Sequence, residues 1–367
     1  MYNKDRLIST FTELCKRDSE SLDERHAAEY VKKYLAERNI EVHEDTVAEK
    51  IGGNTGNLIF ELPGKKPGKI LFSAHIDTVA PGKGVNPVIT ETRISSDGTT
   101  ILGADDKAGV AIILEGIATI IENQIETPTL VVVLSVAEEI GLKGVIHMGE
   151  TIIADCGYVL DSSSVPGTIV NQAPVHYKYE ATVIGKAAHA GLEPEKGINA
   201  IKIAAEAITK IPSGRIDEGT TTNIGKISGG IATNIVTEEV IINGEIRSFD
   251  TQKAERMLKE IKNTFEETAS SLNGSVTFED NKAYDHFIVD EQQECIQKAK
   301  KVISSLGRTP TVISAGGGSD ANIFNQKNIP SVILGLGYEN VHTKQEYIEK
   351  ENLYASMEIV LGLMRDI

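Results

Sequence analysis

The chain has 367 residues and a formal net charge of −16, because 53 acidic side chains outnumber 37 Lys and Arg side chains. Such an acidic balance argues against a nucleic-acid groove or an anionic membrane surface as a partner. A chain of this length exceeds what one hydrophobic core usually serves, so two domains are expected.

The N-terminal residues predict an amphipathic helix over about 3–17, with Leu7, Phe11 and Leu14 on one face. This segment lacks the apolar core of a signal peptide, and no apolar run is long enough to span a bilayer. The three cysteines are scattered and form no C-x-x-C pair, so neither a thiolate zinc site nor a disulfide framework is indicated. We expect a cytoplasmic protein with no membrane partner.

Strand and helix patterns alternate through residues 1–173. After the first helix, a second is expected over about 23–38 and a third over about 107–122. Extended runs rich in branched side chains lie at 69–74, 130–137 and 158–160. The run at 130–137 is apolar without alternation, as expected for a strand that is covered on both faces in a parallel sheet. The pattern predicts a doubly wound α/β domain.

The pattern changes after Pro174 and returns to the α/β type from about residue 283. Between these points, strands are expected at about 176–184, 222–227, 236–249 and 275–279, and helices at about 198–210 and 254–265. This βαββαβ order is that of the ferredoxin-like unit. We therefore predict a discontinuous domain of residues 1–173 and 283–367, interrupted by an inserted domain of residues 174–282.

Side chains that can bind metal ions lie where the predicted strands end or in loops at the same edge. They are His75, Asp105, the pair Glu138 and Glu139, Asp161 and His342. The carboxyl ends of strands in an open α/β sheet form the edge where ligands bind, so these side chains are expected to converge. Two histidines and three carboxylates suit a pair of Zn²⁺ ions, with Mn²⁺ or Co²⁺ as alternatives. Each candidate alone could instead be a satisfied histidine, a helix cap or a solvated acidic turn.

Several of these residues have neighbours that indicate separate roles. Asp77 points the same way as His75 in an extended chain, so its carboxylate can hold the far imidazole nitrogen. Asp105 has two carboxylate oxygens and can bridge two cations. Glu138 and Glu139 end a strand and point to opposite sides, so one can bind a metal ion while the other takes a proton from water.

Four segments combine these residues: 73–78 (Ser-Ala-His-Ile-Asp-Thr), 103–109 (Gly-Ala-Asp-Asp-Lys-Ala-Gly), 137–141 (Ala-Glu-Glu-Ile-Gly) and 341–344 (Val-His-Thr-Lys). Together they resemble the zinc aminoacylase and carboxypeptidase superfamily of M20-type metallopeptidases, and most closely its tripeptidase T group. The resemblance covers essentially the whole chain. It implies a zinc-peptidase catalytic domain with the inserted domain as a lid. The implied activity is that of a metal-dependent exopeptidase, an aminopeptidase acting on short peptides.

The resemblance also divides the ligands between two metal ions that share one carboxylate: His75, Asp105 and Asp161 for one ion, and Asp105, Glu139 and His342 for the other. It makes Glu138 the general base and Asp77 the support of His75. The peptide bond between Asp105 and Asp106 is typically cis in such enzymes. The implied cofactors are two divalent metal ions, most simply Zn²⁺.

By the same resemblance, the inserted domain carries residues that bind substrate. His189 would reach the scissile carbonyl oxygen, often from the partner of a homodimer formed through the lid. Asn234 and Arg247 match positions that hold polar groups or a carboxylate of the peptide, and a planar guanidinium suits a carboxylate. Tripeptidase T has an arginine before its Gly-Gly-Thr-Asp segment, whereas residues 314–320 here (Ser-Ala-Gly-Gly-Gly-Ser-Asp) contain none. The loop at Gly317 still offers backbone donors, but a preference for tripeptides is not implied.

Three other functions fit parts of the same pattern. An N-acyl amino acid deacylase of the same superfamily would use the same metal ligands on a different amide. A metal-dependent binding protein without catalysis would not need Glu138. A serine hydrolase is a weaker alternative, because residues 317–321 (Gly-Gly-Ser-Asp-Ala) lack the second glycine of a nucleophile elbow.

Overall fold

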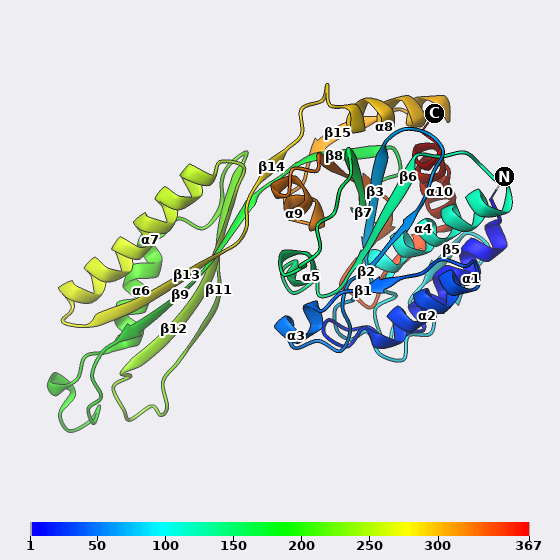
Figure 1. Cartoon of the computed structure of the whole chain (residues 1–367). Coiled ribbons are helices and arrows are strands. Elements are labelled where there is room, and N and C mark those ends of the chain that lie inside the picture. The colour runs from blue at the N-terminus through cyan, green and yellow to red at the C-terminus, as the bar shows by residue number, and fades with distance from the viewer. Residues whose placement is uncertain (1, 367) are drawn as a thin grey trace. The chain divides into compact units, whose positions relative to one another are not determined.

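A computed structural model describes residues 2–366, which form two compact units (Figure 1). The main unit contains the chain up to Gln172, Ile288–Ala315 and the chain from Ser319 onwards. The inserted unit contains Ala173–Phe287 and Gly316–Gly318. The domain ranges predicted from the sequence did not include these three glycines in the insert. No helix within residues 2–366 is both long enough and apolar enough to cross a membrane.

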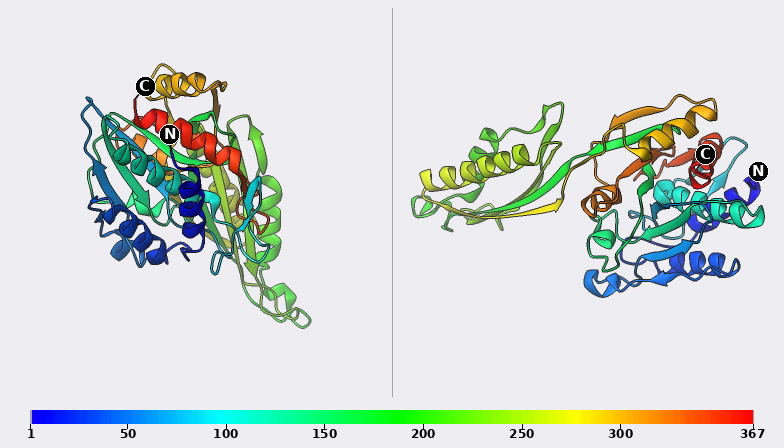
Figure 2. Two further views of the ribbon diagram at one scale, coloured as in Figure 1. Left: turned by 90° about the vertical axis from the view of Figure 1, so that its right-hand side faces the viewer. Right: turned by 45° about the horizontal axis from the view of Figure 1, so that its top comes forward.

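A mixed β-sheet with helices on both sides forms the centre of the main unit (Figures 1 and 2). In the order in which they hydrogen-bond, its strands are β1 (His43–Glu44), β2 (Leu58–Leu62), β6 (Thr129–Ser135), β3 (Lys69–His75), β7 (Cys156–Ser162), β16 (Ser331–Gly335), β8 (Thr168–Ala173) and β14 (Phe287–Ile288), and β15 (Thr311–Ser314) pairs with β8. Strands β6, β3, β7 and β16 are parallel to one another. In contrast, β2 is antiparallel to β6, and β16 is antiparallel to β8. The doubly wound α/β class is therefore confirmed, but the sheet is mixed, with parallel pairing at its centre and between β15 and β8.

The helices of the main unit are α1 (Lys4–Cys15), α2 (Arg25–Ala36), α3 (Val47–Ile51), α4 (Ala104–Glu122), α5 (Lys143–Ile146), α8 (Glu294–Ser305), α9 (Asp320–Gln326) and α10 (Lys350–Met364). Helix α4 is the central one, because it contacts β3, β7, α1 and α10 and is buried along most of its length. A Cβ atom at Gly116 of α4 would lie 2.6 Å from the Met364 sulfur, so glycine permits the close approach of α10. The backbone of α4 is not helical at Asp105 and Asp106, and the predicted helix start at residue 107 marks its regular part.

A second, small sheet lies in the main unit and was not predicted. Its order is β17 (Tyr338–Glu339), β18 (Tyr347–Glu349), β5 (Arg93–Ser95) and β4 (Val88–Ile89). Strands of two or three residues are too short to show the alternation by which strands are predicted. This sheet matters for the site because the loop between β17 and β18 carries His342.

The inserted unit has the predicted βαββαβ order with one additional short strand. Its elements are β9 (Val175–Ile184), the 3₁₀ turn Pro194–Lys196, α6 (Ala200–Lys210), β10 (Gly214–Asp217), β11 (Thr220–Gly229), β12 (Glu239–Ser248), α7 (Thr251–Ser271) and β13 (Ser275–Tyr284). The antiparallel sheet has the order β10-β11-β12-β9-β13. Helices α6 and α7 contact each other and cover one face of the sheet (Figures 1 and 2). The side chains of Asn199 and Asp250 cap the two helices at their first residues.

Candidate metal centre

His75 is the last residue of β3, and its imidazole lies between two acidic residues. Nδ1 lies 2.9 Å from the backbone carbonyl oxygen of Asp77 and 3.4 Å from the Asp77 carboxylate. Nε2 lies 3.1 Å from Asp105 Oδ1. The residue is only 2 % exposed, so these groups take the place of water. An imidazole that is held at Nδ1 in this way presents Nε2 as a metal ligand.

The Asp77 carboxylate has more partners than the sequence predicted. Its Oδ1 accepts the backbone N–H of Glu138 at 3.0 Å, and its Oδ2 accepts that of Glu139 at 3.2 Å. The hydroxyl group of Ser21 also donates to Oδ2, at 2.7 Å. Asp77 therefore holds the two adjacent glutamates as well as His75. Ser21 was missed because nothing in its local sequence connects it with Asp77, which lies 56 residues later.

The Asp105 carboxylate lies between the two histidines of the predicted site. Its Oδ1 is 3.1 Å from His75 Nε2, and its Oδ2 is 3.4 Å from His342 Nε2. The peptide bond between Asp105 and Asp106 is cis, as the resemblance implied. Because each oxygen faces a different imidazole, the geometry suits a carboxylate that bridges two cations.

The structure brings the other predicted ligands to the same place. Ligand atoms of His75, Asp105 and Glu139 all lie within 4.8 Å of one another. Glu139 Oε1 is 3.0 Å from His342 Nε2. Asp161 Oδ1 is 4.0 Å from His75 Nε2. Five side chains from separate parts of the main unit therefore form one cluster.

Acidic groups crowd this cluster. In the described part of the chain, the ion pairs of Asp105, Asp161 and Glu139 are with the two histidines. Burial, and then the charge of Asp161, raises the pKa of Glu138 well above its usual value. Hydrogen bonds to Asp105 and Glu139 raise the pKa of His342 to about 10. Carboxylates and imidazoles that lie this close together can bind divalent cations, which would offset the negative charge.

Tyr338 is a further residue of the site that was not predicted. Its hydroxyl group lies 3.3 Å from both Asp105 Oδ1 and Asp161 Oδ1, and the residue is 2 % exposed. It can therefore donate a hydrogen bond to either carboxylate. The sequence gives only a weak indication of this role, namely that Tyr338 follows Gly337 at the start of the loop that carries His342.

Ser319 has a structural role that argues against a serine nucleophile. The residue is 2 % exposed and lies directly before α9. Its hydroxyl oxygen accepts the N–H of Ala321 at 3.2 Å, and its own N–H donates to the Asn322 side chain at 3.0 Å. This reciprocal arrangement is a capping box, which occupies the hydroxyl group at the helix start.

In the inserted unit, His189 and Asn234 lie in two neighbouring loops. The N–H of Ala190 donates to the carbonyl oxygen of Asn234 at 2.9 Å. His189 Nδ1 accepts the N–H groups of Gly191 and Leu192, each at 3.2 Å. A neutral imidazole that accepts at Nδ1 carries its proton at Nε2. The exposed His189 side chain can therefore act as a hydrogen-bond donor.

Arg247 and Gly317 lie together elsewhere in the same unit. A Cβ atom added at Gly317 would be 3.7 Å from Arg247 Nη1. Arg247 Nε contacts Glu245 Oε1 at 3.1 Å, and Nη1 contacts the Tyr284 hydroxyl group at 3.4 Å. The N–H of Gly318 donates to the same hydroxyl group at 3.1 Å. Glu245 and Tyr284, neither of which was predicted, orient the guanidinium and the glycine loop.

The pair His189 and Asn234 and the pair Arg247 and Gly317 lie at opposite ends of β12. Arg247 pairs with His176 near one end of the β9–β12 ladder. Glu239 pairs with Ile184 at the other end, just before the loop of His189. Positions 239 and 247 are eight residues apart, which is about 26 Å at roughly 3.3 Å per residue. One copy of the inserted unit therefore does not bring His189 and Arg247 to the same small ligand.

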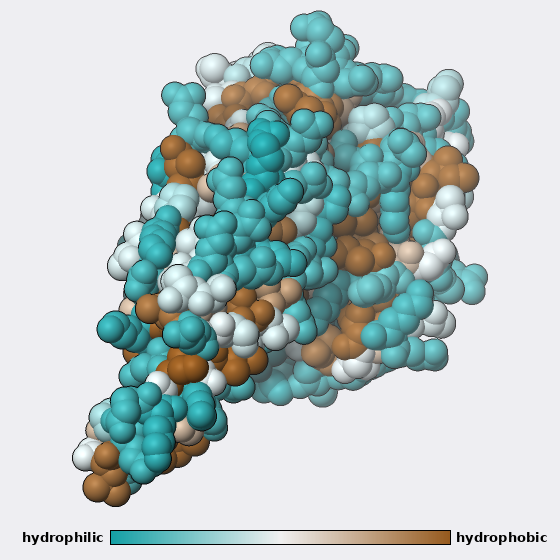
Figure 3. All heavy atoms as spheres, turned by 90° about the vertical axis from the view of Figure 1, so that its left-hand side faces the viewer, coloured by the Kyte–Doolittle hydropathy of each residue, from teal (hydrophilic) through white to brown (hydrophobic). Residues whose placement is uncertain are grey.

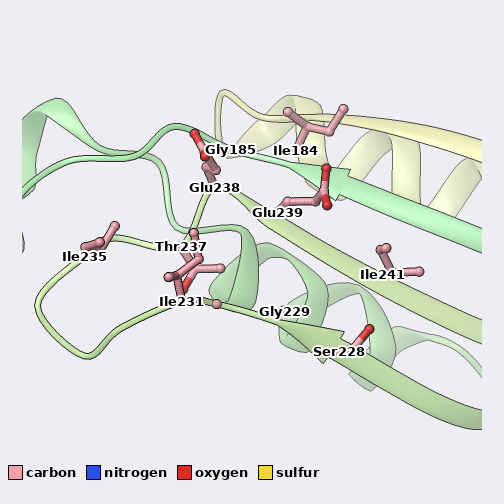
Figure 4. Close-up of a pocket in the computed structure, with 11 residues that line it drawn as sticks. Ile184, Gly185, Ser228, Gly229, Ile231, Ile235, Thr237, Glu238, Glu239 and Ile241 are labelled. Atoms are coloured by element: carbon pink, nitrogen blue, oxygen red, sulfur yellow. The ribbon is translucent and has the colours of Figure 1, made fainter.

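The end of the inserted unit near His189 also exposes apolar side chains. A pocket of about 450 Å³ lies there (Figure 4). Its lining residues are Ile184, Gly185, Ser228, Gly229, Gly230, Ile231, Ile235, Thr237, Glu238, Glu239 and Ile241. Ile231 is 86 % exposed at this pocket. Figure 3 shows hydrophobic side chains in several patches on one face of the molecule. None of the predicted substrate-binding residues lines the pocket, so the pocket is not a candidate substrate site.

Known proteins resemble this chain over its whole length. The family described as "Peptidase family M20/M25/M40" matches residues 71–366. The Bacillus subtilis protein YqjE, described as uncharacterized, is 42 % identical over 100 % of this chain and 99 % of its own length. The solved structure of the aminopeptidase PepT from Bacillus cereus is 42 % identical, with a TM-score of 0.92 over 100 % of this chain and 99 % of that chain. A tripeptidase from Staphylococcus aureus is 39 % identical, with a TM-score of 0.96 over 100 % and 98 % of the two chains. The chain belongs to peptidase family M20/M25/M40.

Proposed function

We propose that the chain is a metal-dependent exopeptidase, and more specifically an aminopeptidase that hydrolyses short peptides with a free amino terminus. The observation that carries this proposal is the position of Asp105, whose two carboxylate oxygens face the imidazoles of His75 and His342. The B. cereus aminopeptidase and the S. aureus tripeptidase, which match the whole chain, support the same activity.

Two divalent metal ions, most simply Zn²⁺, would be held by the clustered side chains. One ion would be bound by His75, Asp105 and Asp161, and the other by Asp105, Glu139 and His342. The same mixed donor set also suits Mn²⁺ or Co²⁺. When bound, such ions supply Lewis acidity, which polarises the scissile carbonyl group and lowers the pKa of the attacking water.

Glu138 would act as the general base. The residue is 9 % exposed, and burial raises the pKa of its carboxyl group, as does the charge of Asp161. A raised pKa suits a group that takes a proton in one step and returns it in the next. Glu138 takes the proton of the water that attacks the amide carbon and passes it to the leaving amine. Asp77 orients this base through the backbone N–H of Glu138.

Arg247 and the loop at Gly317 would bind the carboxyl-terminal end of the peptide. The guanidinium is already oriented by Glu245, so little side-chain freedom is lost when a carboxylate binds. The N–H groups of the glycine loop offer further donors. Without an arginine in residues 314–320, we expect a looser preference for peptide length than in a strict tripeptidase.

His189 would donate a hydrogen bond to the carbonyl oxygen of the scissile peptide, with Asn234 beside it. We infer that it acts in the site of a partner subunit, because His189 and Arg247 lie at opposite ends of β12. The exposed Ile231 and the pocket at the same end supply surface that a second copy of the inserted unit could cover.

Mixing two inactive variants tests whether His189 acts across a dimer. His189→Ala and Glu138→Gln each remove one part of the site from both subunits. In an equimolar, re-equilibrated mixture, half of the dimers are hybrids, and each hybrid has one complete site. We expect the mixture to recover about a quarter of the wild-type activity. A mixture no more active than its components, in which mass spectrometry shows hybrid dimers, would contradict action across the dimer.

A panel of substrates tests the proposed activity. Tri- and dipeptides with free amino termini, a carboxyl-amidated tripeptide and N-acetyl amino acids are assayed with the Zn²⁺- and Mn²⁺-loaded protein and with a chelator control. We expect chelator-sensitive release of N-terminal residues from the free-amine peptides, with a higher KM for the amidated peptide because Arg247 loses its carboxylate. Cleavage of N-acetyl amino acids alone would favour the deacylase. Two bound ions without turnover of any substrate would favour the binding protein.

A further inference from the structure

Glu346 is a buried acidic residue that is not one of the proposed metal ligands. It is 1 % exposed, and its carboxylate accepts hydrogen bonds from four consecutive backbone N–H groups. Oε2 accepts from Leu102 and Gly103, both at 2.8 Å. Oε1 accepts from Ala104 at 2.7 Å and from Asp105 at 3.2 Å. Both oxygens are therefore fully used as acceptors of backbone groups.

The N–H groups of Ala104 and Asp105 belong to the start of α4, where the helix itself cannot bind them, and those of Leu102 and Gly103 directly precede the helix. The first N–H groups of a helix have no carbonyl partner within the helix. Gly103 occupies the cap position with a φ of 76° and has no side chain that could accept. The local sequence thus lacks a capping side chain. Glu346, which lies 241 residues after Asp105 in the chain, supplies the cap instead.

The backbone of Glu346 is part of the loop that carries His342. The Glu346 N–H donates to Thr343 O at 3.2 Å, and the Glu346 carbonyl oxygen accepts the N–H of Ser96 at 2.9 Å. The Thr343 hydroxyl group donates to Asn340 O at 2.7 Å, which closes the loop around His342. The His342 side chain is 49 % exposed, so packing in the core does not orient it.

We propose that Glu346 is a positioning residue of the metal centre, which fixes the loop of His342 against the segment of Asp105 so that both side chains meet at one ion. The inference rests on the proposed function, in which His342 and Asp105 bind metal. The loop cannot leave α4 without breaking four hydrogen bonds to a charged acceptor and leaving buried N–H groups unpaired. The 3.4 Å approach of His342 Nε2 to Asp105 Oδ2 is therefore maintained by contacts that neither side chain makes itself.

Binding of Co²⁺ to the metal-free protein tests this role, because the absorption of Co²⁺ reports its coordination geometry. In Glu346→Gln, one carboxylate oxygen becomes an amide group that donates, so two of the four N–H groups lose their acceptor. We expect the ion that needs His342 to bind about 10–100-fold more weakly, the usual effect of losing a residue that orients a ligand. Its absorption spectrum should change, and the ion at His75 and Asp161 should be affected less.

Glu115 provides a matched control within the same helix. It is a buried glutamate of α4, with 0 % exposure, and its carboxylate accepts the N–H of Asn3 and contacts the Arg6 guanidinium. Asn3 and Arg6 belong to the N-terminal segment, and the third partner, the Thr119 hydroxyl group, belongs to α4 itself, so none of the three lies in a ligand loop. Glu115→Gln should lower Tm but leave both Co²⁺ affinities and the spectrum unchanged.

The outcomes separate positioning from simple helix capping. If Glu346→Gln keeps both affinities and the wild-type spectrum while only Tm falls, Glu346 is a structural cap and the proposal is wrong. Should this variant not fold, Glu346→Asp takes its place with the same expected loss, because its side chain is one methylene too short to reach all four groups. The comparison of the variants uses Co²⁺ affinity, the absorption spectrum and Tm, and not peptidase activity. A wild-type protein that binds two ions but cleaves no peptide would therefore overturn the proposed function alone.

Discussion

Replacement of Glu138 by glutamine is expected to lower kcat for peptide hydrolysis by about 10²–10⁴-fold, the range that a positioned general base contributes. Glutamine has nearly the same size and fits the same buried position, but it cannot take a proton from the attacking water. Because Glu138 is not a ligand in the proposed arrangement, the variant should still bind two divalent ions. Initial rates and metal content per chain, measured on one preparation, check both expectations.

The neighbouring glutamate is the matched control for this experiment. Glu139 Oε1 lies 3.0 Å from His342 Nε2, so Glu139→Gln removes a proposed ligand and not the base. We expect this control to bind one ion more weakly and to recover part of its activity when metal is added in excess. Added metal should not help Glu138→Gln. Activity of Glu138→Gln within about tenfold of the wild type would exclude Glu138 as the base.

The candidate ligands could be predicted from the sequence because strand ends were visible in it. β3 ends at His75, and Asp161 is the next-to-last residue of β7. Both strands are parallel neighbours, so their carboxyl ends meet at one edge of the sheet. The pair Glu138 and Glu139 follows β6, which ends at Ser135, and is tied to the same edge by Asp77.

The residues that hold these ligands in place could not be predicted in the same way. Ser21 lies 56 residues from its partner Asp77, and Tyr338 and Glu346 lie 233 and 241 residues from their partner Asp105, so the local sequence does not show these contacts. The small sheet next to His342 consists of strands of two or three residues, which carry no periodic pattern. Their roles depend on how the loops fold back, and this is a tertiary property.

The inserted unit shows the same division between local and tertiary information. Its strands and helices alternate or repeat with clear periods, so the βαββαβ order was predictable. The glycines Gly316–Gly318 join this unit through contacts that the sequence does not reveal, such as the hydrogen bond from the N–H of Gly318 to Tyr284. Glycine-rich loops have no side-chain pattern from which such a partner could be found.

Replacement of Asp105 by asparagine is expected to have the largest effect on metal binding. The two oxygens of this carboxylate serve different histidines, His75 at 3.1 Å and His342 at 3.4 Å. Asparagine keeps one oxygen, replaces the other by an amide donor and removes the negative charge. We expect the affinity for at least one ion to fall by more than about 100-fold, above the loss caused by a residue that only orients a ligand. Titration of the metal-free protein, with ions counted per chain, checks this.

Asp106 is the matched control, because it is adjacent, buried and of the same type. Its carboxylate accepts two backbone N–H groups, those of Gly109 at 3.1 Å and His75 at 3.3 Å. Asp106→Asn should lower the free energy of unfolding by about 1–2 kcal/mol while both ions still bind. An equal loss of metal in the two variants would mean that the whole segment, and not the Asp105 carboxylate, determines binding.

A bridging carboxylate has a consequence that separate metal sites would not have. If Asp105 is shared, each ion helps to neutralise and orient a ligand of the other, so the two ions should bind cooperatively. His342→Ala should then weaken not only its own ion but also the ion at His75 and Asp161, although neither of these residues is changed. If the two sites were independent, the affinity for the ion at His75 and Asp161 would stay at its wild-type value. Stepwise Co²⁺ titration of His342→Ala therefore distinguishes a shared centre from two adjacent ones.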